Sequence, residues 1–227
     1  MTGVAHRAIE KKRPHLLRSC LQEHARAAYR DAILAAAEEV VLRHGYQATK
    51  MADIAEATGV AVGTVYKYFE NKEAVVLAIT ERHRERFQAH IERPFDSDDP
   101  LRQLRQLVGR ASEFVEQNGA LFNLYLQWKV SECSSGERLS HFTQDAARER
   151  FALLITALLS RGVQARRIRS DIPTVQLVWA LLATLEVVLW EWWRQPTSFS
   201  CKLRGDQIVT VFLEGAAARA RVQGSKE

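Results

Sequence analysis

The sequence contains few residues that interrupt helices or crosslink a fold. Only five prolines and three cysteines occur among 227 residues, and hardly any stretch alternates apolar and polar residues as a half-buried strand does. The cysteines are odd in number, widely spaced and outside metal-ligand patterns, so we expect reduced thiols. Apolar residues recur at helical spacing instead. We therefore predict an all-α protein of about nine helices.

The sequence also lacks signals for export, membrane insertion and common enzyme chemistry. No apolar segment follows the basic N-terminus as in a secretory signal, and the most apolar run, Val178–Trp190, is interrupted by Glu186 and too short to span a bilayer. We find no nucleophile elbow, phosphate loop, HExxH or dinucleotide fingerprint. We expect a cytoplasmic protein that is not an enzyme and has no metal and no cofactor.

The charge is mildly basic and unevenly distributed. A formal charge of +5 and a pI near 9.3 permit an anionic partner such as nucleic acid without requiring one. Seven Lys and Arg residues and only two acidic residues lie between Met1 and Arg30. We predict a flexible basic extension over residues 1–22; an arm that contacts DNA phosphates is the alternative interpretation.

Residues 49–69 have the pattern of two short helices joined by a tight turn. The first is predicted to be capped by Thr49, and Gly59 after it can take a positive φ at no steric cost. A second helix over Val62–Phe69 has low intrinsic helicity and depends on the packing of Val65 and Phe69. Two such helices form a helix-turn-helix, a unit that presents its second helix to DNA.

At these positions the sequence resembles the TetR family of bacterial transcriptional regulators, over roughly residues 26–78. The matching residues are Ala36, Val40, Gly45, Tyr46, Thr49, Ile54, Ala55, Gly59, Val60, Gly63, Thr64, Tyr66, Tyr68, Phe69, Lys72 and Glu73. The resemblance implies a helix-turn-helix domain over 23–71, a connecting helix over 72–93, and a helical effector-binding and dimerisation domain over 94–227.

The resemblance also implies which residues face DNA. A homodimer would place its two recognition helices in successive major grooves of a palindromic operator. By position, Thr49, Tyr68 and Lys72 would contact phosphates, and Lys50 would lie beside them. The groove itself would be lined by Val62, Gly63, Thr64, Tyr66 and Lys67. The position of Lys72 at a helix start, where the dipole disfavours a cation, is consistent with a phosphate partner; the alternative is that Glu73 offsets the charge and Lys72 is solvated.

The C-terminal half suggests a dimer interface and an effector pocket. The helix over 173–194 is apolar almost all round, so it needs cover on more than one side. With the helix over 206–221, it is predicted to form a four-helix interface through Leu185, Leu189, Trp192, Ile208, Phe212 and Gly215. Candidate effector contacts are Phe122, Tyr125, Trp128, Phe151, Trp179 and Glu186. As a carboxylate in an apolar stripe, Glu186 needs a partner, which is a cationic ligand, an arginine across the dimer or water.

We therefore predict a homodimeric repressor that binds operator DNA, associates with the bacterial nucleoid and is released by a small apolar or amphipathic effector. One alternative is a DNA-binding protein without an effector, which acts through a protein partner or organises the nucleoid. Another is a binding protein for hydrophobic small molecules whose helix-turn-helix is vestigial.

Overall fold

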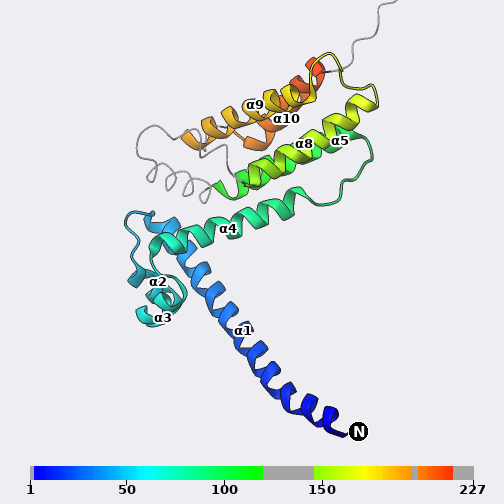
Figure 1. The fold of residues 1–227 in the computed structure, drawn as a ribbon. Helices are drawn as coiled ribbons and strands as arrows, with labels where there is room; N and C mark the ends of the chain where they lie inside the picture. Colours follow the sequence, from blue (N-terminus) through cyan, green and yellow to red (C-terminus); the bar gives the residue numbers. More distant parts are fainter. Residues whose placement is uncertain (1–2, 120–145, 196–198, 217–227) are drawn as a thin grey trace, which may run out of the picture. The chain divides into compact units, whose positions relative to one another are not determined.

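The computed structural model describes residues 3–119, 146–195 and 199–216, and these contain eight α-helices and no β-strand (Figure 1). The helices are α1 (Gly3–His44), α2 (Met51–Thr58), α3 (Val62–Tyr68), α4 (Lys72–Ile91), α5 (Pro100–Gln117), α8 (Ala146–Gln164), α9 (Thr174–Arg194) and α10 (Cys201–Ala216). The predicted all-α class is confirmed. The apolar spacing also predicts helices over 119–131 and 137–164; residues 120–131 of the first and 137–145 of the second lie outside the described residues.

Helix α1 begins much earlier than the sequence pattern predicts. Apolar periodicity indicates a helix from about Arg26, after a flexible extension, whereas α1 runs without interruption from Gly3 to His44. The prediction is therefore wrong for residues 3–22. Periodicity marks only a helix that packs against something, and every side chain from 22 to 32 is exposed. Helix α10 likewise begins at Cys201 rather than at Asp206.

The chain forms two compact units, Met1–Glu81 and Arg82–Glu227, with the boundary inside α4. In unit 1, α1 packs against α2, and α2 against α3. The buried apolar side chains of unit 1 are Ile33, Leu34, Ala37, Val40, Val41, Met51, Ile54, Ala55, Val65, Phe69, Val75, Val76 and Ile79. Helical spacing also predicts that Tyr29 shares the apolar stripe of Ile33 and Ala37, but Tyr29 is 54% exposed, as part of the exposed stretch 22–32 that precedes Ile33.

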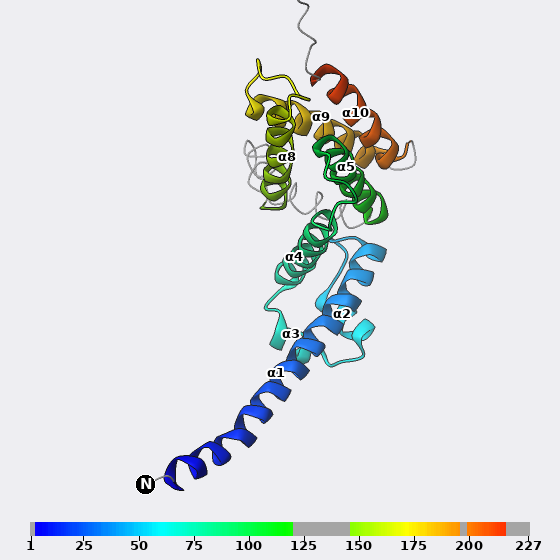
Figure 2. The same cartoon turned by 90° about the vertical axis from the view of Figure 1, so that its right-hand side faces the viewer.

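In unit 2, α5, α8, α9 and α10 form a bundle in which each helix packs against two others (Figures 1 and 2). Both α5 and α9 contact α8 and α10. The bundle buries an apolar core that includes Leu104, Leu107, Val108, Phe151, Ile155, Leu159, Leu177, Leu181, Leu185, Val209 and Leu213. A second, smaller cluster holds Val115, Trp192 and Cys201. Burial, followed by the charge of Glu116, raises the pKa of the Cys201 thiol to about 11.

Helix α10 approaches α5 most closely at a glycine. A Cβ at Gly205 would lie 2.3 Å from the Ser112 Oγ and 3.2 Å from the Ser112 Cβ. The side chain of Ser112 is buried, so the crossing of the two helices depends on the absence of a side chain at Gly205. At Gly215, a residue of the predicted dimer interface, a Cβ would meet nothing within 4 Å among the described residues.

By length and composition alone, the segment Thr174–Trp192 is apolar enough to cross a membrane, although the shorter run seen in the sequence did not suggest it. This is weak support for a membrane span, since core helices of globular proteins pass the same test. Here the segment belongs to α9, which packs against α8 and α10 and buries Leu177, Leu181 and Leu185.

Candidate nucleic-acid interface

Helices α2 and α3 are joined by a turn that contains Gly59. Gly59 has a φ of 72°, in the left-handed region that glycine adopts without steric cost. Its N–H donates to the Glu56 carbonyl at 3.1 Å, and the Val60 N–H donates to the Ala55 carbonyl at 3.0 Å. These bonds satisfy carbonyls at the end of α2, so the helix stops and the chain turns into α3. The predicted role of Gly59 is confirmed.

Helix α3 is held by one buried face. Val65 is 0% exposed and Phe69 is 3% exposed, as the sequence predicts. The Arg30 guanidinium lies 5.2 Å from the centroid of the Phe69 ring, so α1 contacts the end of α3 through a cation–π contact. Packing of this kind explains why a seven-residue segment with low intrinsic helicity is helical.

The opposite face of α3 carries the side chains predicted to read DNA. Tyr66 is 52% exposed and Val62 40% exposed, and Gly63 and Lys67 are also exposed. A Cβ at Gly63 would meet nothing within 4 Å, so the backbone there is open to an approaching partner. The last two members of the predicted set, Thr64 and Tyr68, are half-buried. The face thus combines one cation, aromatic hydroxyls and accessible backbone.

The start of α2 differs from the prediction. Thr49 does not cap α2: it is 2% exposed, and its hydroxyl donates to the Gly45 carbonyl at 2.8 Å. The Asp53 carboxylate instead accepts a hydrogen bond from the Lys50 N–H at 2.8 Å, and so it satisfies an amide at the helix start. Because the one hydroxyl proton of Thr49 is committed within unit 1, Thr49 cannot also donate to a phosphate in this arrangement. The side chain of Lys50 is exposed.

Lys72 also has internal partners. Its Nζ donates to the Tyr46 carbonyl at 2.8 Å and the Gln47 carbonyl at 3.3 Å, and lies 4.4 Å from the centroid of the Tyr46 ring. A cation at the first position of α4 is therefore explained by carbonyl oxygens of the turn between α1 and α2, without a phosphate. Asn71 caps the same helix, since its Oδ1 accepts from the Ala74 N–H at 2.7 Å.

Glu73 completes this cluster. Its Oε1 accepts a hydrogen bond from the Tyr46 hydroxyl at 3.0 Å. The pKa of Glu73 is lowered, first by a backbone hydrogen bond, then by the Tyr46 hydroxyl, with a contribution from the charge of Lys72. Tyr46, Lys72 and Glu73, which we call the turn clamp, tie the turn after α1 to the start of α4. Sequence reasoning found these residues through the family pattern but not their contacts with one another.

The predicted effector residues do not form one group in the structure. Phe122, Tyr125 and Trp128 lie outside the described residues. Phe151 is buried in the bundle, whereas Trp179 is 65% exposed on α9. The Glu186 carboxylate accepts a hydrogen bond from the Arg148 Nε at 2.5 Å, so its partner is an arginine of its own chain on α8.

Aromatic rings on three helices, α4, α5 and α8, gather around Phe87. The rings of Phe87 and Phe114 meet edge to face with centroids 5.4 Å apart, and Phe151 lies 6.3 Å from Phe87. The His90 ring lies 5.6 Å from Phe114, and its buried Nε2 has no hydrogen-bond partner among the described residues. Burial, followed by the charge of Arg93, lowers the pKa of His90, so the imidazole is neutral at pH 7. We call Phe87, His90, Phe114 and Phe151 the aromatic cluster.

The predicted dimer residues divide between the inside and the outside of unit 2. Leu185 and Trp192 are only 8% and 5% exposed, so their own unit already covers them. Leu189, Ile208 and Phe212 are half-buried, and Gly215 is exposed. The apolar side chains that α9 and α10 leave uncovered form a different set, which we call the exposed apolar face: Val175, Trp179, Val187, Trp190, Leu203 and Val211.

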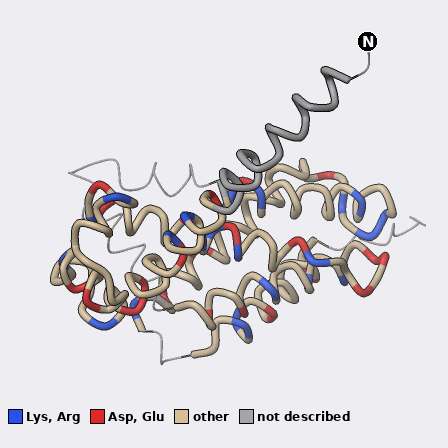
Figure 3. The backbone as a smooth tube through the Cα atoms, turned by 90° about the horizontal axis from the view of Figure 1, so that it is seen from below, with Lys and Arg blue, Asp and Glu red and all other residues tan. Residues whose placement is uncertain are grey.

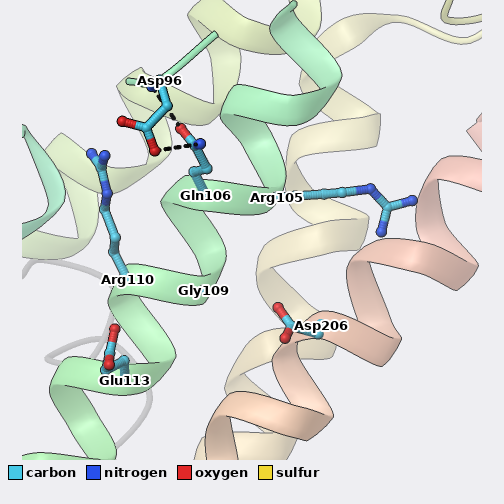
Figure 4. Close-up of a pocket in the computed structure, with 7 residues that line it drawn as sticks. All are labelled: Asp96, Arg105, Gln106, Gly109, Arg110, Glu113 and Asp206. Carbon is cyan, nitrogen blue, oxygen red and sulfur yellow. Dashed lines mark hydrogen bonds between the residues drawn. The ribbon is translucent and has the colours of Figure 1, made fainter. Parts of the chain in front are cut away.

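A cleft of about 330 Å³ lies on the surface of unit 2 and is polar (Figure 4). It is lined by Asp96, Arg105, Gln106, Gly109, Arg110, Glu113 and Asp206. Within it, Gln106 donates to the Asp96 carboxylate at 3.1 Å, and Arg105 donates to the Thr210 hydroxyl at 2.7 Å. A second cleft, of about 340 Å³, is bordered by Glu191, Arg194, Gln195, Phe199 and Arg204. Neither cleft contains a predicted effector residue.

The helix-turn-helix region is similar to a known protein family and to known repressors. The family described as "Bacterial regulatory proteins, tetR family" matches residues 33–79. The chain is 45% identical to the HTH-type transcriptional repressor ComR of Escherichia coli (strain K12) over 60 residues, which are 26% of this chain and 29% of ComR. It is 26% identical to the HTH-type transcriptional repressor KstR2 of Rhodococcus jostii (strain RHA1) over 83% of this chain and 91% of KstR2.

Solved structures extend the similarity to the whole fold. The TetR-family regulator PfmR from Thermus thermophilus is 25% identical, with a TM-score of 0.62 over 80% of this chain and 97% of PfmR. The regulator FadR from Bacillus subtilis, solved in complex with stearoyl-CoA, is 19% identical, with a TM-score of 0.61 over 81% of this chain and 97% of FadR. All four proteins are named as regulators or repressors of transcription.

Proposed function

Since this chain belongs to the TetR family of bacterial transcriptional regulators, we propose that it is a homodimeric repressor of a palindromic operator, released by a small apolar or amphipathic effector. The observation that carries the proposal is the two-faced helix α3. Val65 and Phe69 hold one face inside unit 1, while Tyr66, Lys67 and the open backbone at Gly63 remain free on the other. A short helix held in this way suits the major groove.

Recognition of the operator sequence would depend on a few polar contacts with bases and on the shape of the DNA. Lys67 is the one cation on the exposed face of α3, so it is our candidate for a guanine contact. Val62 and Tyr66 offer apolar contacts with base edges, and sequence-dependent DNA shape would add to the discrimination. Lys50 and Tyr68 would contact phosphates. Thr49 and Lys72 would act indirectly, by holding the turn between α1 and α2 in place.

The partner subunit would cover the exposed apolar face. Val175, Trp179 and Val187 follow one another on α9 at helical spacing and are each at least 50% exposed. On α10, Leu203 and Val211 are 59% and 70% exposed. Two copies that pair these helices would bury the apolar side chains in a four-helix interface. Gly215, at which a Cβ would meet nothing within 4 Å among the described residues, offers a site of close approach.

The effector would bind beside the aromatic cluster. Phe87, Phe114 and Phe151 provide an apolar wall, and the buried Nε2 of His90 offers one hydrogen bond to a polar group. The FadR structure holds stearoyl-CoA, which supports a ligand with a long apolar part. Since α4 also carries the turn clamp, its displacement would change operator affinity. Such coupling is typically about 1–3 kcal/mol, and operator DNA would weaken effector binding by the same factor.

Selection from a random duplex library tests the proposal. We expect the full-length protein to recover a palindromic consensus near physiological salt, and we expect Tyr66→Ala to lose it. Tyr29→Ala is the matched control, because Tyr29 is as exposed as Tyr66 (54% against 52%) but lies on α1 outside the recognition helix. Recovery of duplexes without a common pattern would contradict operator reading. It would favour instead a nucleoid organiser or a protein that depends on a partner.

A further inference from the structure

The segment that joins α4 to α5 is held in place along its whole length. Residues 92–99, which we call the anchor segment, contain four acidic residues, and most of the side chains are exposed. Each residue nevertheless contacts α5, α8 or the turn after α8. Acidic and basic residues are interspersed along the described part of the chain, so partners of both signs are available for such contacts (Figure 3). The connection between the two helices is therefore not a loose linker.

Helix α5 holds the first half of the anchor segment through one guanidinium. Arg110 donates to the Arg93 carbonyl at 2.5 Å and to the Pro94 carbonyl at 2.7 Å. The same guanidinium lies 5.0 Å from the centroid of the Phe95 ring, which packs against the core of unit 2. Because the N–H groups of arginine point in fixed directions, this one side chain fixes three consecutive residues. The end of α4 cannot shift along α5 without breaking these contacts.

A buried glutamine of α5 holds the second half of the anchor segment. Gln103 is 6% exposed, and its Nε2 donates to the Ser97 carbonyl at 2.6 Å. Its Oε1 accepts a hydrogen bond from Arg161 of α8 at 2.7 Å, and Arg161 also donates to the Asp98 carbonyl at 2.9 Å. Loss of one member would leave a buried polar group without a partner, which costs more than the loss of an exposed hydrogen bond. This network therefore joins the segment to two helices at once.

Two aspartates of the anchor segment have partners of their own. Gln106 donates to the Asp96 carboxylate at 3.1 Å and accepts from the Asp96 N–H at 3.2 Å (Figure 4). Asp99 caps α5 by accepting from the Leu101 N–H at 3.1 Å. The Asp99 carboxylate also lies 2.9 Å from the Arg167 guanidinium. The segment is thus held up to the first turn of α5.

Helix α8 holds the beginning of the anchor segment. The Arg150 Nε donates to the Glu92 carboxylate at 2.5 Å, and this hydrogen bond is the main reason why the pKa of Glu92 is lowered. Arg150 directly precedes Phe151 of the aromatic cluster in α8. In α5, Arg110 lies one turn before Phe114. The helices that hold the end of α4 are therefore helices that also carry the aromatic rings.

We infer that Arg110 and Arg150 are positioning residues, which fix the end of α4 in unit 2 and so restrict the operator spacings that a dimer can bind. The inference rests on the proposed function and deepens its account of how an operator is selected. Helix α4 is continuous across the two units, since residues 72–81 belong to unit 1 and residues 82–91 to unit 2. A dimer held together through unit 2 reads half-sites at a set separation only if α4 has a fixed end there. A loosely held end would let each recognition helix reach half-sites at other separations.

Operators with altered spacing test the inference on the full-length protein. Affinity is measured for the selected operator and for two derivatives, with one base pair added or removed between the half-sites. We expect the wild type to bind both derivatives roughly tenfold or more weakly, which corresponds to about 1.4 kcal/mol. Arg110→Met and Arg150→Met keep a long side chain that cannot donate, so we expect these variants to lose only about threefold or less on the same derivatives.

Matched variants separate position from charge. Glu92→Met breaks the same ion pair as Arg150→Met with the opposite change of charge, so both variants should lose the discrimination to the same extent. Arg102→Met removes an exposed arginine of α5 that makes none of these contacts, and it should keep the wild-type discrimination. Ratios between operators are compared, because the loss of a cation that neutralises phosphate weakens binding to every duplex alike. Wild-type discrimination in Arg110→Met and Arg150→Met would overturn the inference, as would equal relaxation by Arg102→Met.

Hydrogen exchange tests the anchor segment without DNA. The N–H groups of Glu92, Asp96 and Asp99 all have acceptors, so peptides that cover the segment should exchange slowly in the wild type. Exchange should be faster in Arg110→Met and unchanged in Arg102→Met. A wild-type segment that exchanges as fast as an unfolded chain would overturn the inference. A wild-type protein that selects no palindromic consensus would contradict the proposed function instead, and the exchange comparison would then decide between a held and a loose segment.

Discussion

The two units of this protein use their helices in opposite ways. In unit 1, α2 and α3 are short, are joined through Gly59 in the left-handed conformation, and expose a polar and aromatic face at Tyr66 and Lys67. In unit 2, α9 is apolar almost all round, buries Leu185 and leaves Trp179 exposed. The difference shows that turn chemistry and spacing predict which face of a short helix is buried. For a helix that is apolar all round, the buried face depends on the helices that pack against it.

The largest expected effect tests which face of α9 is buried. Trp192→Ala removes a buried indole that packs with Val115 and Cys201, so we expect unit 2 to lose about 3–5 kcal/mol of stability. Trp190→Ala, two residues away and 48% exposed, should leave the stability of the monomer nearly unchanged and should weaken the proposed dimer. Denaturant unfolding and sedimentation velocity measure the two effects. Equal destabilisation by both changes would contradict the assignment of the two faces.

A smaller effect distinguishes residues that stabilise the fold of unit 1 from residues that contact DNA bases. Lys72→Ala removes two hydrogen bonds and a cation–π contact from the turn clamp, and we expect unit 1 to lose about 1–3 kcal/mol. Its affinity should fall equally for all duplexes. Lys67→Ala should leave the melting temperature unchanged and relax preference at one base pair, by about 1–3 kcal/mol. A change of base preference caused by Lys72→Ala would show that Lys72 itself reads DNA.

The smallest expected effect concerns pH. The lowered pKa of Glu73 means that its carboxylate stabilises the folded state above its ordinary pKa of 4.5, and that this contribution disappears as the pH falls through the lowered value. Because the group is largely exposed, we expect only a few tenths of a kcal/mol. Glu73→Gln should therefore reduce the acid sensitivity of unit 1 in thermal melts below about pH 4.5. Glu70→Gln, which removes an exposed carboxylate from the loop just before α4, is the matched control. An identical acid response in the two variants would exclude this role for Glu73.

Sequence reasoning succeeded where local rules apply. The positive φ of Gly59, the buried Val65 and Phe69, and the exposed Tyr66 all follow from turn chemistry and helical spacing over a few residues. It did not reach contacts with residues far along the chain. The Nζ of Lys72, for which the sequence predicts a phosphate, donates to carbonyls 25 and 26 residues earlier, and the phosphate contact stays a prediction.

The same reason limits prediction in unit 2. The apolar spacing of α9 and α10 predicts that both helices have buried faces. It does not distinguish a face buried in the core of unit 2 from a face buried against a partner subunit. Leu185 and Trp192 were assigned to a partner, and both are covered within their own unit. The partner of Glu186 was also undecided in the sequence, because Arg148 lies on another helix.

The all-α class, the helix-turn-helix and the resemblance to the TetR family can be predicted from the residues alone, because each depends on spacing and turn chemistry within a few tens of residues. The packing of the helices sets which face of α9 is buried, places Lys72 and Thr49 against the turn between α1 and α2, and puts Gly205 against Ser112. These outcomes depend on contacts between distant segments, and such contacts are set by how whole helices pack.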